Sequence, residues 1–258
     1  WYLSLYGFSS VEELRKHLGQ CEVIFDAGCG LGYKAAWLAE LSPKALVIGM
    51  DFSEAAAQAA KTYHSIPNLF FIRGDIATTG FFDGVIDYVN CDQVIQHTQE
   101  PAATFAELSR ICNSQGEIAC YFYAKKALSR ELLDEYFRSA CSKLSRDELW
   151  QMSEQVTELG RRLSELKVSI ECPEIPALGI KEGTYDIQRF IYWNFLKCFW
   201  NEELGPETSV ITNFDWYSPS NAFRFSQEDV RALIRDNNLR QIYFHTEEAC
   251  YSGRFACA

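Results

Sequence analysis

An acidic residue and three glycines at alternating positions mark the first candidate site of this chain. Asp26, Gly28, Gly30 and Gly32 stand directly after an apolar run that begins at Val23. Glycines let a backbone turn sharply and lie close to a ligand, and the first turn of a following helix offers unpaired N–H groups. The segment therefore predicts a nucleotide-cofactor site between a strand and a helix.

The spacing of the glycines separates two cofactor classes. A dinucleotide fingerprint needs glycines at the first, third and sixth positions, and Tyr33 occupies the sixth position counted from Gly28. A nicotinamide-dependent dehydrogenase is therefore a weak alternative. The pattern D-x-G-x-G-x-G instead resembles the first motif of class I S-adenosylmethionine-dependent methyltransferases. This resemblance implies that the acid, the glycines and the residue between two of them bind S-adenosylmethionine: Asp26, Gly28, Cys29, Gly30 and Gly32.

Two more acids end predicted strands. Asp51 comes 19 residues after Gly32, where its carboxylate can accept hydrogen bonds from both hydroxyls of a ribose. Capping of the next helix is the structural alternative for Asp51. Asp75 ends the third strand, and the resemblance implies that Asp75 and Ile76 lie beside adenine. It also implies a cofactor contact for Phe52.

The end of the fourth predicted strand carries further candidates. The segment 90–101 resembles a methyltransferase loop that lies beside the methionine part of the cofactor and the acceptor. By this resemblance, three residues contact the cofactor: Cys91, Asp92 and Gln93. His97 has a side chain suited to general-base chemistry near neutral pH, and holding the loop before Pro101 is its structural alternative.

Another group of candidates stands late in the chain. The segment 213–219, N-F-D-W-Y-S-P, places a carboxylate, an indole and a phenol in a predicted loop before the last helix. Apolar neighbours raise the pKa of a carboxyl group, so Asp215 is the first candidate for a general base, ahead of His97. Asp92 and Tyr123 are further base candidates. The candidate acceptor contacts are Tyr123, Trp216 and Tyr217. The segment and the H-T-Q-E-P run at 97–101 are together similar to an uncharacterised bacterial group of methyltransferases with a helical insertion.

Alternating strand and helix patterns position these residues. Between residue 22 and about 125, short apolar runs alternate with amphipathic ones, which is typical of a parallel sheet with helices on both faces. We predict strands over 22–26, 45–51, 69–75, 85–91 and 117–123. Helices are predicted over 10–18, 33–41, 53–64 and 101–112.

The pattern becomes helical after the fifth strand. Helices are predicted over 131–140, 146–165 and 186–201, with a loop over 171–183. A helix over 226–237 and strands over 239–246 and 250–257 then complete an α/β fold. We expect a seven-stranded Rossmann-like sheet with helices on both faces and a helical insertion after the fifth strand. The predicted regions are an N-terminal helical segment, 1–20, a methyltransferase core, 21–126 and 226–258, and an insertion, 127–225, that caps the site and supplies most acceptor contacts.

The composition of the chain limits the classes of partner that it is expected to bind. The net charge of −11 and the absence of basic runs longer than dipeptides disfavour nucleic acid. No apolar run is long enough for a membrane span, and no secretory signal is present. The 10 cysteines form no C-x-x-C pair, which disfavours zinc and favours buried thiols in a reducing, cytoplasmic setting. Because the first residue is Trp1 rather than Met, we expect that residues precede it.

These interpretations favour methyl transfer from S-adenosylmethionine to an oxygen or nitrogen of a small-molecule acceptor, without a metal. The alternative is a catalytically silent subunit that binds the cofactor and uses its aromatic insertion to hold or regulate a partner protein. An exposed apolar patch on the insertion would favour that alternative. The acceptor, its reacting atom and the oligomeric state stay open.

Overall fold

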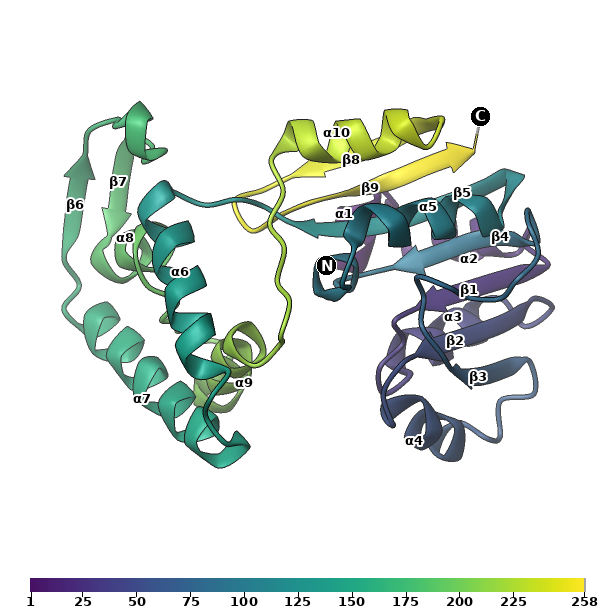
Figure 1. Ribbon diagram of the computed structural model, residues 1–258, viewed down its shortest axis with the longest axis horizontal. Helices are drawn as coiled ribbons and strands as arrows, with labels where there is room; N and C mark the ends of the chain where they lie inside the picture. Colours follow the sequence, from purple (N-terminus) through teal and green to yellow (C-terminus); the bar gives the residue numbers. More distant parts are fainter. Residues whose placement is uncertain (258) are drawn as a thin grey trace. The chain divides into compact units, whose positions relative to one another are not determined.

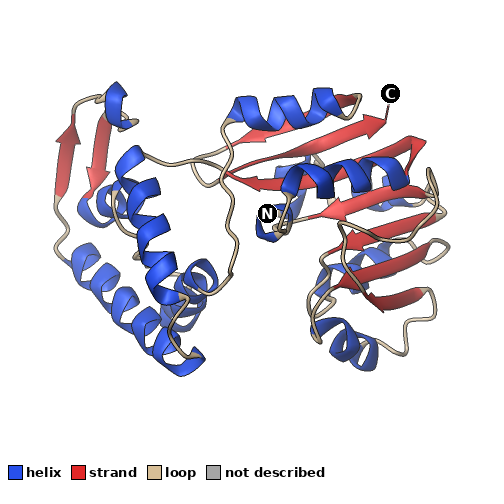
Figure 2. Ribbon diagram, viewed as in Figure 1, coloured by secondary structure: helices blue, strands red, loops and turns tan. Residues whose placement is uncertain are grey.

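The computed structural model describes residues 1–257, and these form two compact units. The sheet unit contains Trp1–Ala124 and the chain from Phe223 onward, and the helical unit contains Lys125–Ala222. Figure 1 labels the elements, and Figure 2 shows that one unit is built around a large sheet whereas the other is mainly helical. Each unit is described by itself below.

A seven-stranded sheet with the order β3-β2-β1-β4-β5-β9-β8 forms the centre of the sheet unit. Its strands are β1 (Val23–Ala27), β2 (Leu46–Asp51), β3 (Leu69–Arg73), β4 (Ile86–Cys91), β5 (Cys112–Tyr123), β8 (Leu239–Thr246) and β9 (Cys250–Cys257). The first five run parallel, and β9 is antiparallel to both β5 and β8. This order confirms the predicted Rossmann-like α/β fold. The order reverses between β1 and β4, and such sheets bind ligands at the carboxyl ends of the strands at this point.

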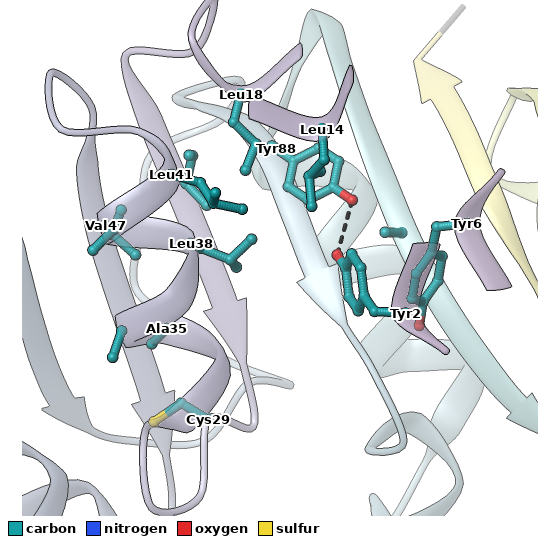
Figure 3. Packing of buried hydrophobic residues seen from close by; sticks show 14 of the residues in the cluster. Tyr2, Tyr6, Leu14, Leu18, Cys29, Ala35, Leu38, Leu41, Val47 and Tyr88 are labelled. Carbon is teal, nitrogen blue, oxygen red and sulfur yellow. Dashed lines mark hydrogen bonds between the residues drawn. The ribbon is translucent and has the colours of Figure 1, made fainter. Parts of the chain in front are cut away.

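Helices cover both faces of the sheet because successive strand residues alternate between them. On one face, α1 (Tyr2–Tyr6), α2 (Val11–Leu18) and α3 (Tyr33–Leu41) contribute to one hydrophobic cluster with the strands, which includes Leu14, Leu38 and Val47 (Figure 3). On the other, α5 (Pro101–Ile111) and α10 (Gln227–Asp236) bury Phe105 and Val230. The helix α4 (Ala55–Thr62) packs beside β2 and β3.

The helical unit contains four helices and a short hairpin within the described residues. Its elements are α6 (Leu128–Cys141), α7 (Arg146–Glu165), β6 (Ser169–Cys172), the 3₁₀ turn η2 (Pro176–Leu178), β7 (Gly183–Asp186), α8 (Ile187–Asn194) and α9 (Gly205–Tyr217). Helix α7 begins with the reciprocal capping of Ser145 and Glu148, which stabilises a helix start. No helix among residues 1–257 is long and apolar enough to cross a membrane.

Three local predictions for this unit are wrong. The predicted loop 171–183 contains parts of β6 and β7, which pair antiparallel. The predicted helix 186–201 ends at Asn194, because the Asn213 side chain bonds both the N–H and the C=O of Phe199 and holds that segment outside a helix. The predicted loop 213–219 instead contains the end of α9, which begins with Pro206 in its first turn.

Candidate functional site

The glycine loop joins β1 to α3 at the point where the strand order reverses. Gly28, Gly30 and Gly32 have φ of 79°, 51° and 84°, a region that favours glycine. A Cβ on Gly28 would overlap Val94, whereas a Cβ on Gly30 would meet no atom within 4 Å. Gly28 therefore permits close packing against the loop after β4, and Gly30 leaves its backbone open to a ligand.

Asp51 at the end of β2 is bonded to this loop. Its Oδ2 accepts the N–H of Gly30 at 3.0 Å, and its Oδ1 accepts the N–H and the hydroxyl of Ser53 at 2.9 and 2.7 Å. Asp51 does not cap α4, whose N-cap residue is Glu54, but its carboxylate orders the segment before that helix. A carboxylate has about four acceptor positions, and Asp51 is only partly buried, so ribose hydroxyls fit beside these bonds.

The residues expected near adenine differ in exposure. Asp75 lies two residues beyond β3, and its Oδ1 accepts the N–H of Ala77 at 2.9 Å. Ile76 is buried, whereas the side chain of Phe52 is 77% exposed. An exposed aromatic ring beside the end of β2 offers a flat apolar surface to a base.

Asp26 in β1 is a buried acid with an unsatisfied oxygen. It is in register with Asn90 of β4, whose Nδ2 donates to Asp26 Oδ1 at 2.6 Å. Its Oδ2 has no hydrogen-bond partner among the described residues, and burial raises the pKa of Asp26 to about 6. A buried carboxylate oxygen without a donor is costly, so this atom fits a donating or cationic group of a ligand.

Asp92, just after β4, brings a second buried acid to the same edge. Its Oδ1 accepts the hydroxyl of Tyr6 at 2.7 Å, and its Oδ2 forms an ion pair with Lys34 of α3. Burial lowers the pKa of Lys34, whose ammonium also lies 5.6 Å from the centre of the Trp1 ring. The pair places one negative and one positive group side by side. Asp92 suits the ammonium and Lys34 suits the carboxylate of a ligand that has the α-amino and α-carboxyl groups of an amino acid. The methionine end of S-adenosylmethionine has both.

Tyr6 was not among the predicted site residues, although it lies in the N-terminal segment 1–20 that was predicted to be helical. Tyr2 and Tyr6 lie one turn apart in α1 and are both buried. The hydroxyl of Tyr2 donates to Asn90 Oδ1 at 2.8 Å and lies 3.0 Å from the hydroxyl of Tyr88 (Figure 3). The spacing of the two tyrosines was the available signal, but a helix of five residues is too short to show a period.

The remaining cofactor candidates lie in the glycine loop and around the end of β4. Cys29 and Cys91 are buried free thiols, and Cys91 belongs to the apolar core, so only its backbone is available to a ligand. Gln93 has a φ of 65°, which is uncommon for a residue other than glycine. Gln96 is fully buried, and neither of its amide atoms has a partner among residues 1–257. Strain and unsatisfied polar groups of this kind gather at ligand sites.

The candidate bases are divided between the two units. In the sheet unit, His97 in the 3₁₀ turn η1 (Ile95–His97) lies edge-on to Tyr123 of β5, with ring centres 5.4 Å apart. In the helical unit, α9 carries the base candidate Asp215 and two candidate acceptor contacts, Trp216 and Tyr217. Desolvation raises the pKa of Asp215, and nearby Lys197 opposes this shift. No group of acidic, His or Cys side chains within the described residues is arranged to hold a metal ion.

Comparison with known proteins finds a matching domain in the first half of the chain. A family model described as a methyltransferase domain matches residues 25–120. The chain is 34% identical over 94 residues to malonyl-[acyl-carrier protein] O-methyltransferase from Legionella pneumophila, covering 36% of this chain and 33% of that protein. It is 32% identical over 114 residues to an uncharacterized methyltransferase from Schizosaccharomyces pombe, covering 41% of each. The chain thus spans less than half the length of these curated relatives.

The fold has a relative among solved structures. A SAM dependent methyltransferase from Aquifex aeolicus superposes with a TM-score of 0.51 and 12% identity, covering 99% of this chain and 92% of that one. At this identity the match shows the fold alone. The family model, the strand order and the loop of positive-φ glycines agree with one another. The chain therefore matches a methyltransferase domain over residues 25–120, within a sheet that has the fold of a solved SAM dependent methyltransferase.

Proposed function

We propose that this protein transfers the methyl group of S-adenosylmethionine to an oxygen or nitrogen atom of a small-molecule acceptor. The observation that carries the proposal is the group at the carboxyl ends of β1 and β4: the open backbone of Gly30, the unpartnered oxygen of Asp26 and the pair of Asp92 with Lys34. When bound, S-adenosylmethionine supplies a methyl group that its sulfonium makes electrophilic. The O-methyltransferase name of the Legionella relative supports oxygen as one acceptor atom.

Each part of the cofactor has a group in the sheet unit suited to hold it. Asp51 receives the ribose hydroxyls, and Phe52 with Ile76 borders the adenine. Asp26 and Asp92 face the ammonium of the methionine end, and Lys34 faces its carboxylate. Opposite charges in a partly buried site bind more strongly than in water, so this end fixes the orientation of the methyl group.

The protein then has three tasks: to hold the acceptor in line with the methyl group, to exclude water and to remove a proton from the acceptor. Asp215 is the proposed base, since desolvation raises its pKa and so makes the carboxylate a better proton acceptor. His97 is second, because its contact with Tyr123 also serves to hold the loop. With an acceptor in hand, Asp215→Asn lowers turnover and leaves cofactor affinity unchanged. Loss of turnover in His97→Gln alone reverses the ranking.

The helical insertion is proposed to supply most contacts to the acceptor. Its connections leave the carboxyl edge of the sheet: Phe223 N–H donates to Gln96 O at 2.8 Å, and Ala124 bridges to Phe225. Incubating the protein with a metabolite extract and isotope-labelled S-adenosylmethionine, followed by mass spectrometry, identifies the methylated acceptor. Trp216→Ala then raises the KM for that acceptor and leaves cofactor affinity unchanged.

Calorimetry tests the cofactor assignment directly. Loss of a charge-assisted hydrogen bond costs about 1.5–3 kcal/mol, so Asp51→Ala weakens S-adenosylmethionine binding at least about tenfold. Asp147→Ala is the matched control, because this acid is exposed in the first turn of α7. Unchanged affinity in a folded Asp51→Ala variant contradicts the assignment.

One observation favours the silent-subunit alternative. Leu128, Leu132 and Tyr136 are 48%, 63% and 73% exposed and follow one another at intervals of four along α6, so they form one apolar row. A subunit that only binds the cofactor would use such a row to hold a partner. Labelled product from the extract excludes this alternative, whereas cofactor binding without any product supports it.

A further inference from the structure

Two cysteines meet at the amino edge of the parallel strands, away from the candidate cofactor site. Cys112 is the first residue of β5, and Cys257 is the last residue of β9, which runs antiparallel to β5. The register pairs Glu117 with Ala256, so the next position along the two strands places Cys257 opposite Gly116. Side chains of paired strand residues point to the same face of a sheet. A Cβ on Gly116 would lie 2.8 Å from Cys112 Sγ, so both cysteine side chains occupy this face.

The two thiols are in direct contact. They share a side-chain hydrogen bond, and Cys257 Sγ also lies 3.8 Å from the backbone oxygen of Cys112. Both cysteines are free thiols in this structure. A disulfide forms only between cysteines whose side chains approach each other closely, and this pair meets that condition.

The two thiols differ in acidity and exposure. The hydrogen bond from Cys112 lowers the pKa of Cys257, although burial opposes this shift. The same bond and burial raise the pKa of Cys112, and the nearby carboxylates of Glu117 and Asp87 add to the rise. Cys257 is partly exposed, whereas Cys112 is buried. Because the thiolate is the reactive form of cysteine, Cys257 is the thiol that an oxidant in solution attacks first.

We propose that Cys112 and Cys257 form a reversible disulfide when the protein meets a peroxide, and that this bond fastens β9 to β5. The Cys257 thiolate attacks one oxygen of hydrogen peroxide, which breaks the O–O bond, gives a sulfenic acid and releases the other oxygen as water. Cys112 then attacks the sulfur of Cys257, an S–S bond forms, and the sulfenic hydroxyl leaves as a second water with the proton of Cys112. The two thiols lose two electrons and the peroxide gains them. This inference does not rest on the proposed function.

A second pair of cysteines supplies an internal comparison. Cys91 and Cys120 are register partners in β4 and β5, and their side chains also share a hydrogen bond. Both are fully buried, so an oxidant in solution does not reach them. Contact between two thiols is thus common to both pairs, and exposure of one sulfur distinguishes the pair of Cys112 and Cys257.

Peptide mapping tests the proposal on the full chain. The reduced protein is treated with hydrogen peroxide, the remaining thiols are alkylated, and the denatured protein is digested without reductant and measured by mass spectrometry. Cleavage after Glu117 and after Arg254 separates Cys112 from Cys120 and Cys257 from Cys250. The expected product joins the peptides of Cys112 and Cys257, is two hydrogens lighter than their sum and disappears with dithiothreitol.

The same map contains the results that would overturn the proposal. These are no link between Cys112 and Cys257 after peroxide, a link between Cys91 and Cys120 that forms as readily, or a link of Cys257 to a second copy of the chain. The last result is recognised as a dimer on a gel run without reductant.

Serine variants test the order of the two steps. In Cys112→Ser, peroxide leaves Cys257 as a sulfenic acid that dimedone labels, because its partner thiol is gone. In Cys257→Ser, dimedone does not label Cys112. Cys172→Ser is the matched control, because Cys172 is a partly exposed free thiol of the helical unit, and this variant keeps the link. Equal dimedone labelling of Cys112 and Cys257 in the two variants overturns the assignment of Cys257 as the attacking thiol.

Thermal unfolding tests whether the disulfide fastens the strand. The bond would join residues that are 145 positions apart in the chain, and closing a long loop restricts the unfolded state strongly. The oxidised protein is expected to melt at least about 3 °C above the reduced protein. The melting temperature of Cys257→Ser does not change with peroxide. Equal melting temperatures of the linked and the reduced protein overturn the fastening role.

Discussion

The sheet unit and the helical unit differ in the charged side chains that they gather in one place. At the carboxyl ends of β1 and β4, the sheet unit buries Asp26 and Asp92, with Lys34 as the nearby cation. The helical unit instead gathers cations such as Arg130 and Lys197 around aromatic rings. A cofactor with a cationic sulfonium and an ammonium group suits the first environment. The comparison shows that the two cores of one acidic chain can differ in charge, with acids grouped in one core and cations in the other.

The largest effect is expected from removing the single buried acid of the helical unit. Asp134→Ala leaves Arg130 buried without a counter-charge and lowers the free energy of unfolding by about 3–5 kcal/mol, measured by urea denaturation. Lys197→Met removes a buried charge and leaves the free energy of unfolding equal or higher. If Lys197→Met destabilises as much as Asp134→Ala, a nearby acid compensates the charge of Lys197 after all.

A smaller effect is expected from the hydroxyl that supports the acids of the sheet unit. Tyr6→Phe leaves Asp92 Oδ1 without its donor and costs about 1–3 kcal/mol of stability. Tyr243→Phe is the control, since its hydroxyl donates to the backbone oxygen of Ser4 at an exposed place. The same calorimetry shows weaker S-adenosylmethionine binding for Tyr6→Phe alone. Equal stability of the two variants would mean that Asp92 finds another donor.

The smallest effect is a pH dependence that comes from Asp26. Its pKa in the folded protein is about 6, above the roughly 3.9 of an exposed aspartate, so the fold favours the neutral acid. Its contribution to stability is therefore complete below about pH 4 and is lost as the pH rises to about 6. A cationic cofactor favours the ionised acid instead.

Binding of S-adenosylmethionine should therefore weaken as the pH falls below about 6, by up to about tenfold for each pH unit. Titration calorimetry between pH 5 and 7 measures this dependence. In Asp26→Asn the dependence disappears. An equally steep dependence in that variant assigns the titration to another group.

Local spacing explains what the sequence predicted well. The glycines of the first loop act through their own backbone, so the turn with positive φ at Gly28, Gly30 and Gly32 could be predicted from their order alone. Side chains of a strand point alternately to the two faces of a sheet, so strands can likewise be recognised from local sequence. The seven-stranded sheet was predicted correctly.

Other features depend on contacts between distant parts of the chain. The helix after Asp186 ends early because the side chain of Asn213 forms hydrogen bonds with the backbone of Phe199. A local sequence pattern does not predict a bond between residues so far apart in the chain. The roles of Tyr6 and Lys34 arise only when α1 and α3 approach the end of β4. The buried cations of the helical unit lie on α6 and in the segment after α8, so their grouping could not be predicted from the spacing of residues.

The bridge between Ala124 and Phe225 has a consequence for how such a protein can change over evolutionary time. The chain leaves the sheet unit after Ala124 and re-enters it at Phe223, and the N–H of Phe225 donates to the C=O of Tyr123 at 2.8 Å. The two points where the chain leaves and re-enters the sheet unit are thus paired with each other by residues that lie outside the 125–222 segment. An insertion of different length or architecture between these two points would leave this pairing intact. The sheet unit can therefore be kept while the inserted segment is replaced by one with another specificity.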